Sequence, residues 1–277
     1  MTPPEAPSPD TPDSWGAASR GYAEHVAPLM MRPFAEDIVE RLGLSDDAEV
    51  IEVAAGSGAL TELLAAKATS VLATDFAPEM VDVLRERMKS RGATNVRCEV
   101  MDGTSLDVAD SSYDAAGCSF GLMFFPERQK GFDELFRVTR PGGRVAASGW
   151  TGPDTFEAFG LFLAALNAAF PDMPPPPAPP PVFNLADPAV FGSHMETAGF
   201  RDVQVEHVAH DLEIRDVEQT WTMLTVGAPP VQALFDRVGA DGEERIHDEL
   251  RRVVADRFGS GPIRVRNVAT LASGTAG

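Results

Sequence analysis

Short apolar runs alternate with amphipathic segments through the middle of the chain, and this alternation limits the possible folds more than any other feature. The apolar runs occupy residues 50–54, 71–74, 96–101, 113–120 and 144–149, and helix-like segments follow at 60–68, 78–91 and 128–139. Strands and helices that alternate at this interval form parallel βαβ units with right-handed crossovers. Because the strands are almost uniformly apolar, helices should cover both faces of the sheet. The sequence therefore predicts an α/β fold with a doubly wound, mainly parallel sheet.

The segment before this alternating core is expected to contain two regions, a tail and then a helical part. Residues 1–14 contain five prolines and almost no large apolar side chains, which predicts a disordered, Pro-rich tail. Residues 15–42 carry apolar side chains at helical spacing, interrupted by Pro28 and Pro33, which predicts one or two helices. Together with the alternating core, these helices form a predicted unit over residues 15–150.

After Trp150 the alternation stops and then resumes. Residues 151–186 combine an aromatic helical stretch with a proline run, and we expect them to form a lid inserted between a strand and its following helix. The α/β pattern continues over 187–277 with a helix at 189–198 that Gly199 ends, a strand at 203–214 and a last strand at 262–272. A helical insertion at about 217–258 separates these two strands.

Composition argues against several classes of protein. The net charge of −19 disfavours a broad phosphate-binding surface, and with it nucleic-acid binding. The longest apolar stretches are shorter than the ~20 residues that a membrane span requires, and the first residues lack the pattern of an export signal. Cys98 and Cys118 lie in strand-like segments without metal-ligand spacing. These features predict a cytoplasmic enzyme with buried thiols.

The densest chemical signal is the turn after the first strand. The segment Glu52-Val53-Ala54-Ala55-Gly56-Ser57-Gly58 places glycines between strand and helix, where the absence of Cβ lets a ligand approach the backbone. A dinucleotide-binding turn would carry a third glycine where Thr61 stands, which argues against NAD(P). An NAD(P)-dependent oxidoreductase is still the alternative enzyme class, because it uses a similar turn.

Two carboxylates end the next two strands. Asp75 follows the second strand about 20 residues after the turn, where a carboxylate can accept hydrogen bonds from both ribose hydroxyls. Asp102 ends the third strand. Because ligands bind at the carboxyl ends of parallel strands, these aspartates and the glycine turn predict a ribose-and-adenine site. Each aspartate could instead merely cap the turn or helix that follows it.

Four blocks, at residues 52–58, 74–80, 101–103 and 135–144, occur in a characteristic order. In that order the chain resembles the class I S-adenosylmethionine-dependent methyltransferases, in particular the small-molecule branch that includes the quinone-biosynthesis C-methyltransferases. The resemblance implies a Rossmann-like methyltransferase fold with a seven-stranded sheet and helical and aromatic lid insertions. It also implies S-adenosyl-L-methionine as cofactor and S-adenosyl-L-homocysteine as product. One departure is Ala54, where the family most often has glycine, and its methyl group can crowd the methionine part of the cofactor.

The resemblance implies a cofactor role for each matching residue. The first block and Tyr22 would bind the methionine end, with Tyr22 closing over its carboxylate, while Ser119 and Phe120 would lie under the sulfonium. The residues after the second and third strands would bind the nucleoside, Asp75 at the ribose and Asp102 at the adenine amino group. The full implied set is Tyr22, Glu52, Ala54, Gly56, Gly58, Asp75, Phe76, Met80, Met101, Asp102, Gly103, Ser119 and Phe120.

Aromatic residues around the fifth strand are the clue to the methyl acceptor. They predict a large, apolar, ring-containing molecule such as a quinone, polyketide or indole-type secondary metabolite. Its O, N or C atom would take the methyl group by in-line SN2 displacement. The same rings could instead form ordinary helix packing or a homodimer contact. The residues in question are Trp150, Phe156, Phe159, Phe162, Phe170, Phe183 and Phe191.

A general base is needed only if the acceptor must lose a proton. The catalytic candidates are His25, one turn from Tyr22, and His194, on the helix that leads to Gly199. Neither belongs to a recognisable Ser/His/Asp or metal cluster, and no metal-ligand set is visible, which disfavours a Mg²⁺-dependent mechanism. A methyltransferase-like binding protein without turnover is a further alternative, because a fold does not by itself imply a reaction.

Overall fold

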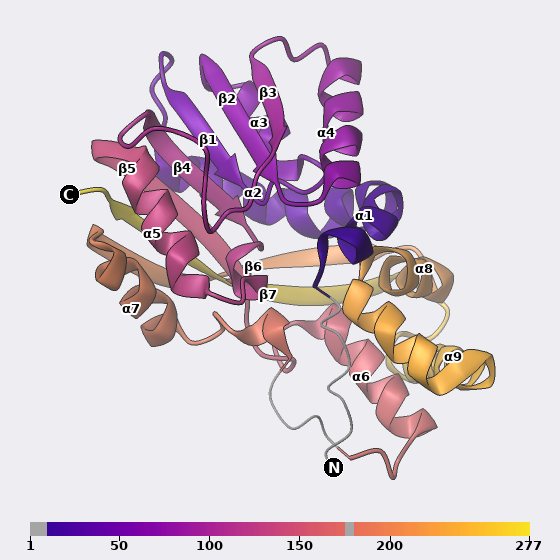
Figure 1. Ribbon diagram of the computed structural model, residues 1–277. Helices are drawn as coiled ribbons and strands as arrows, with labels where there is room; N and C mark the ends of the chain where they lie inside the picture. Colours follow the sequence, from indigo (N-terminus) through magenta and orange to yellow (C-terminus); the bar gives the residue numbers. More distant parts are fainter. Residues whose placement is uncertain (1–9, 175–179) are drawn as a thin grey trace, which may run out of the picture.

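The computed structural model describes residues 10–174 and 180–277, and its strands form a seven-stranded sheet in the order β3-β2-β1-β4-β5-β7-β6 (Figure 1). All neighbouring strands are parallel except β7, which runs antiparallel to both β5 and β6. The predicted α/β fold with a mainly parallel, seven-stranded sheet is confirmed. The strands are β1 (Glu49–Val53), β2 (Ser70–Asp75), β3 (Val96–Val100), β4 (Tyr113–Ser119), β5 (Thr139–Trp150), β6 (Arg201–Ile214) and β7 (Ile263–Thr275).

Helical segments precede β1, and most of the connections between successive strands also contain helices. Within the described ranges, no helix combines the length and apolar character needed to cross a membrane. The helical segments are α1 (Pro12–Gly21), the π-helix η1 (Tyr22–Met31), α2 (Arg32–Leu42), α3 (Ala59–Ala65), α4 (Pro78–Ser90), the short 3₁₀ turn η2 (Leu122–Phe124), α5 (Arg128–Val138), α6 (Glu157–Ala169), the 3₁₀ turn η3 (Pro181–Phe183), α7 (Pro188–Ala198), α8 (Val217–Gly227) and α9 (Pro229–Phe258).

Successive residues of the central strands face two different hydrophobic cores. On β1, Ile51 and Val53 belong to the core that α5 and α7 cover, whereas Val50 belongs to the core under α2 and α3. On β4, Ala116 and Ala115 divide between the two cores in the same way. Side chains alternate across a strand, so a strand that is apolar throughout must be covered on both faces. This burial is the physical reason for the uniform apolar runs in the sequence.

The N-terminal region is more helical than the sequence predicted. Residues 1–9 of the expected tail lie outside the described residues, but its last residues are not a disordered tail, because α1 begins at Pro12. The Thr11 hydroxyl accepts the backbone N–H of Ser14 at 3.2 Å, and the Ser14 hydroxyl oxygen accepts the N–H of Thr11 at 3.1 Å. This reciprocal cap, with proline at the first helical position, stabilises a helix start.

Pro28 and Pro33 do not break the N-terminal helices, contrary to the prediction. The chain stays in the right-handed helical conformation where α1, η1 and α2 meet. Pro28 lies inside η1, whose hydrogen bonds join residues five apart, and Pro33 lies in the first turn of α2. Both positions tolerate a residue that lacks an N–H donor.

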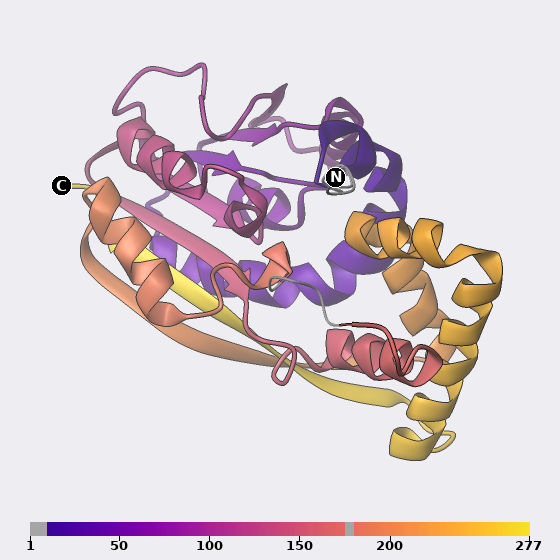
Figure 2. The same ribbon diagram turned by 60° about the horizontal axis from the view of Figure 1, so that its bottom comes forward.

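Two segments gather as a lid at one end of the long β6–β7 pair. Figures 1 and 2 show α6, from the 151–186 segment, beside α9, from the 217–258 segment, and α9 in turn contacts α8. Phe162 of α6 packs against Phe235 of α9, with ring centroids 6.3 Å apart. The α9 helix bends at Gly239, whose φ of +72° is not helical. Residues 175–179 of the proline run lie outside the described residues.

Gly21 provides a close contact between the N-terminal helices and α8. A Cβ built on Gly21 would lie 2.8 Å from the Cβ of Val226 and would collide with the Val226 carbonyl oxygen. We expect Gly21→Ala to lower the melting temperature by roughly 3–10 °C, because overpacking costs about 1–3 kcal/mol. Gly192→Ala on α7 is the matched control, since its Cβ would meet Val205 at an ordinary 3.5 Å. An unchanged melting temperature for Gly21→Ala would contradict this packing.

Candidate active site

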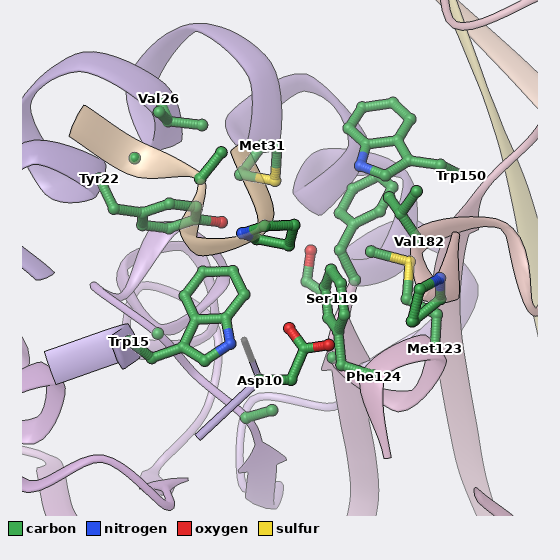
Figure 3. A pocket seen from close by; sticks show the side chains of 18 of the residues that line it. Asp10, Trp15, Tyr22, Val26, Met31, Ser119, Met123, Phe124, Trp150 and Val182 are labelled. Atoms are coloured by element: carbon green, nitrogen blue, oxygen red, sulfur yellow. The ribbon is translucent and has the colours of Figure 1, made fainter. Parts of the chain in front are cut away.

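A cavity of about 590 Å³ lies between the carboxyl ends of the parallel strands and the lid (Figure 3). This volume is typical of small-molecule sites. Eleven of the thirteen residues implied by the family resemblance line it, all but Glu52 and Gly58. The cavity residues at the strand ends and in the loops and helix starts that follow them are Ala54, Gly56, Asp75, Phe76, Met80, Met101, Asp102, Gly103, Thr104, Ser119, Phe120 and Gly121.

The turn after β1 has a backbone that suits glycine. Ala54, with φ of +55°, and Gly56, with φ of +56°, both lie in the left-handed region. Glycine adopts this conformation without steric cost, whereas the Cβ of alanine costs roughly 1–2 kcal/mol. A Cβ on Gly121, after β4, would also collide with the methyl group of Ala54. The departure at Ala54 is therefore accommodated by a glycine on the facing loop.

Asp75 joins two loops at the end of β2. Its carboxylate accepts the backbone N–H of Gly56 at 2.8 Å and that of Ala77 at 3.1 Å. Burial raises the pKa of Asp75, and these backbone donors oppose the increase. The bond to Ala77 supports the start of α4, as the capping alternative proposed, but Asp75 also lines the cavity and faces the glycine turn.

Asp102 organises the loop after β3. One of its oxygens accepts both the N–H and the hydroxyl of Thr104, each at 2.8 Å. This is the turn-capping role that the sequence left open, and it holds Asp102 and Gly103 at the cavity. A Cβ on Gly103 would approach the Phe125 ring to 2.6 Å, so Phe125 packs directly on this loop.

Glu52 and Gly58 support the turn from behind and do not line the cavity, so their contact with the cofactor stays a prediction. Glu52 is fully buried, and its Oε2 accepts the Thr61 hydroxyl at 2.5 Å, while Oε1 has no hydrogen-bond partner among the described residues. Burial raises the pKa of Glu52 to about 8; the Thr61 bond lowers it, and the charge of Asp75 raises it by less. A Cβ on Gly58 would crowd Leu84, so this glycine lets α4 pack closely.

The N-terminal helices supply an aromatic group to the cavity. Trp15 makes edge contacts with Tyr22 and Phe124, with ring centroids 6.0 and 5.4 Å apart. Burial, and secondarily the carboxylate of Asp75, raises the pKa of Tyr22 well above its usual range, so its hydroxyl stays protonated and can donate. Figure 3 shows the Tyr22 hydroxyl and the Asp10 carboxylate directed into the cavity.

Four roughly parallel rings lead from the strand ends into the lid. Phe120 stacks on Trp150 at 4.1 Å, Trp150 on Phe156 at 4.0 Å, and Phe156 on Phe159 at 5.7 Å. All four line the cavity. Aromatic stacking holds such rings in a fixed orientation, so the cavity has a rigid, apolar wall on this side.

The other predicted lid aromatics have packing roles. Phe162 contacts Phe235, Phe183 contacts Phe159, and Phe191 contacts Phe132, while Phe170 lies under the Arg245 guanidinium. None of Phe162, Phe170, Phe183 and Phe191 lines the cavity. For these four residues the alternative of ordinary helix packing is correct.

Neither of the two catalytic candidates, His25 and His194, lines the cavity. His25 is partly exposed, and its ring lies 3.9 Å from Glu24. His194 stacks on Phe132 and shares a 2.7 Å hydrogen bond with Gln129, between α5 and α7. Among the described residues that line the cavity there is no histidine. A helix position one turn from a site residue does not determine which way a side chain points.

Several lining residues escaped the sequence prediction. The α8 helix contributes Thr220, Met223, Leu224 and Gly227, whose spacing follows one helix face. The same periodicity marks any buried helix, so it carries no chemical signal. Trp15, Phe124 and Phe125 also line the cavity, although aromatic residues at such positions usually pack in a core. In residues 10–174 and 180–277, no cluster of His, Cys, Asp and Glu could hold a metal ion.

Comparisons with known proteins agree with this geometry. Residues 50–143 match the family model for a methyltransferase domain. An uncharacterized protein of Mycobacterium tuberculosis is 32% identical over 154 residues, which are 54% of this chain and 55% of that protein. The ubiquinone/menaquinone biosynthesis C-methyltransferase UbiE of Geobacter sp. is 29% identical over 178 residues, which are 60% of this chain and 76% of that protein. The chain spans about half the length of the first relatives that it matches.

A solved structure shares the fold. The YcgJ protein of Bacillus subtilis superposes with a TM-score of 0.57 at 17% identity, covering 87% of this chain and 97% of that one. The Rossmann-like fold expected from the resemblance is thus confirmed. Over residues 50–143 the chain resembles a methyltransferase domain. Its resemblance to the class I S-adenosylmethionine-dependent methyltransferases, with the quinone C-methyltransferases among them, is confirmed as well.

Proposed function

We propose that this protein is an S-adenosylmethionine-dependent methyltransferase that acts on an apolar, ring-containing small molecule. One observation carries the proposal: a single cavity joins the nucleoside-type residues at the strand ends to a wall of stacked aromatic rings in the lid. Such a cavity can hold a cofactor and an acceptor side by side, which a methyl transfer requires.

The residues at the strand ends fit this cofactor. Asp75 presents a buried carboxylate that can accept ribose hydroxyls, and Phe76 and Met80 can flank an adenine ring. The Oγ of Ser119 is buried without a hydrogen-bond partner among the described residues, and Figure 3 shows it directed into the cavity. An unpaired buried hydroxyl at this position favours a polar ligand group beside it. When bound, the cofactor supplies an activated methyl group on a sulfonium.

The chain's own groups orient the reactants and exclude water. The protonated Tyr22 hydroxyl can donate to a carboxylate at the methionine end. The lid residues Met223 and Val231 close the cavity with apolar side chains. With no histidine among the described lining residues, alignment of the acceptor is the main contribution we assign to the protein.

The aromatic wall of the cavity favours an apolar methyl acceptor. The stacked rings ending at Phe159 provide a flat surface against which a planar ring can lie. Quinones, polyketides and indole-type metabolites fit this description, with O, N or C as the methylated atom.

The proposal also places the protein in the reducing cytoplasm, because Cys98 and Cys118 are buried free thiols. A homodimer is a further proposal.

Calorimetric titration with S-adenosylhomocysteine tests the donor side. We expect binding, and we expect NADH to show none under the same conditions. Transfer of labelled methyl groups from S-adenosylmethionine to a panel of aromatic acceptors then tests the reaction. Binding of NADH without binding of S-adenosylhomocysteine would support the oxidoreductase alternative. Cofactor binding without transfer to any acceptor of the panel would favour a binding protein.

A further inference from the structure

The aromatic wall of the cavity contains one polar atom that the described residues leave unpaired. Trp150, the last residue of β5, is 3% exposed and lines the cavity. Among the described residues, nothing accepts a hydrogen bond from its indole N–H. Buried tryptophan N–H groups usually find a partner, because an unpaired buried donor costs free energy.

Three aromatic rings hold the Trp150 indole in one orientation. Phe120 and Phe156 stack on it with centroids at 4.1 and 4.0 Å, and Phe34 packs edge-on at 5.2 Å. Two stacked rings this close to one centroid would collide on the same face, so they cover the two faces of the indole. An edge of the indole therefore meets the cavity, and Figure 3 shows its nitrogen on the side of the ring turned toward Ser119.

The neighbouring polar side chains have other roles. Thr220, which lines the cavity from α8, donates its hydroxyl to the carbonyl oxygen of Asp216 at 3.3 Å. Ser119, at the end of the adjacent strand β4, has an unpaired hydroxyl that we assign to the cofactor side. The N–H of Trp150 is thus a donor that belongs to the aromatic wall itself.

This donor gives the wall a direction that stacking alone does not provide. A planar ring that lies on flat aromatic surfaces can still slide and rotate in its own plane. One hydrogen bond from a fixed N–H to the edge of that ring removes this freedom, and methyl transfer requires such an orientation. Phenylalanine at position 150 would supply a flat surface without a donor.

We propose that Trp150 is a specificity-determining residue, whose indole N–H donates a hydrogen bond to an oxygen on the ring of the methyl acceptor. This inference rests on the proposed function and deepens it, since it narrows the acceptors to planar rings that carry a carbonyl or a comparable accepting oxygen. The stacked rings select the flat shape, and the N–H selects the oxygen. An indole or hydrocarbon ring without such an oxygen lacks this bond.

The test compares two probes that differ by one carbonyl oxygen. The probes are 1-tetralone and tetralin, and calorimetric titration follows their binding to protein saturated with S-adenosylhomocysteine. We expect Trp150→Phe to lower the ratio of 1-tetralone affinity to tetralin affinity about tenfold, because only the ketone loses a hydrogen bond. Trp221→Phe is the matched control and should leave the ratio unchanged, since Trp221 stacks on His247 and does not line the cavity.

A measurement on the wild-type protein does not depend on how well Trp150→Phe folds. The chain has three tryptophans, so a ¹⁵N-labelled sample gives three indole N–H signals. Trp15→Phe and Trp221→Phe identify two of them, and the third belongs to Trp150. We expect 1-tetralone to move the Trp150 proton signal downfield and tetralin to leave it nearly in place, because the two probes share the same aromatic ring.

Four results would overturn the inference. They are failure of 1-tetralone to bind, an unchanged affinity ratio in a folded Trp150→Phe variant, an equal response of the Trp150 signal to both probes, and displacement of 1-tetralone by S-adenosylhomocysteine. The last would assign the N–H to the cofactor and leave the proposed function intact. If S-adenosylhomocysteine itself does not bind, the proposed function fails, and the two probes in the free protein still decide whether Trp150 recognises an oxygen.

Discussion

Asp75→Asn should weaken the binding of S-adenosylhomocysteine by roughly 30- to 1,000-fold. Asparagine has nearly the same shape, but it replaces one carboxylate oxygen with a donor group and removes the charge. Two charge-assisted hydrogen bonds to ribose hydroxyls would be lost or weakened, at a cost of about 2–4 kcal/mol. Calorimetric titration of the wild-type protein and the variant measures this difference directly.

A second ligand separates binding from loop structure, because Asp75 also accepts the N–H groups of Gly56 and Ala77. The wild-type protein should prefer S-adenosylhomocysteine over its 2′-deoxy analogue, and Asp75→Asn should lose that preference. A variant that binds both ligands weakly but keeps the preference would show that Asp75 only supports the loops. Asp82→Asn, an exposed position on α4, serves as the matched control and should bind like the wild-type protein.

Strand burial made most of the sheet predictable from the sequence. Each central strand has one helix-covered core on each face, so its residues read as an uninterrupted apolar run. The first residue of β5 was harder to place. Thr139 already pairs with Tyr113, but Pro141, Gly142 and Gly143 interrupt the register before Arg144 continues it. A local run of turn residues therefore concealed a strand that tertiary pairing extends.

The glycine turn and the aspartates could be predicted because strand ends bring them to one edge. Contacts that depend on the direction of a side chain could not be predicted in this way. Glu52 belongs to the matching block, yet it points behind the turn to Thr61. Trp15 lies far from the strands in sequence, and only the packing of α1 brings its ring to Phe124. His194 is a further example, because α7 turns its ring toward Phe132 and not toward the cavity.

Glu52 makes the stability of the protein depend on pH in an unusual direction. Its pKa rises from an ordinary 4.5 to about 8 in the folded protein, mainly because burial disfavours the charged form. Between these values the folded state binds the proton that the unfolded state has already released. Stability from this group is therefore complete below pH 4.5, falls as the pH rises toward 8, and stays low above it.

Glu52→Gln should remove this loss, because glutamine has the shape of the protonated acid and cannot ionise. At pH 5 the variant and the wild-type protein should have similar free energies of unfolding. At pH 8.5 the variant should be more stable by roughly 2–4 kcal/mol, which is the ionisation penalty less the cost of an unpaired amide group. Urea unfolding at both pH values measures the difference, and Glu99→Gln on β3 controls for loss of a surface charge. A difference that does not change with pH would mean that Glu52 ionises without penalty, so burial beside Asp75 would not raise its pKa.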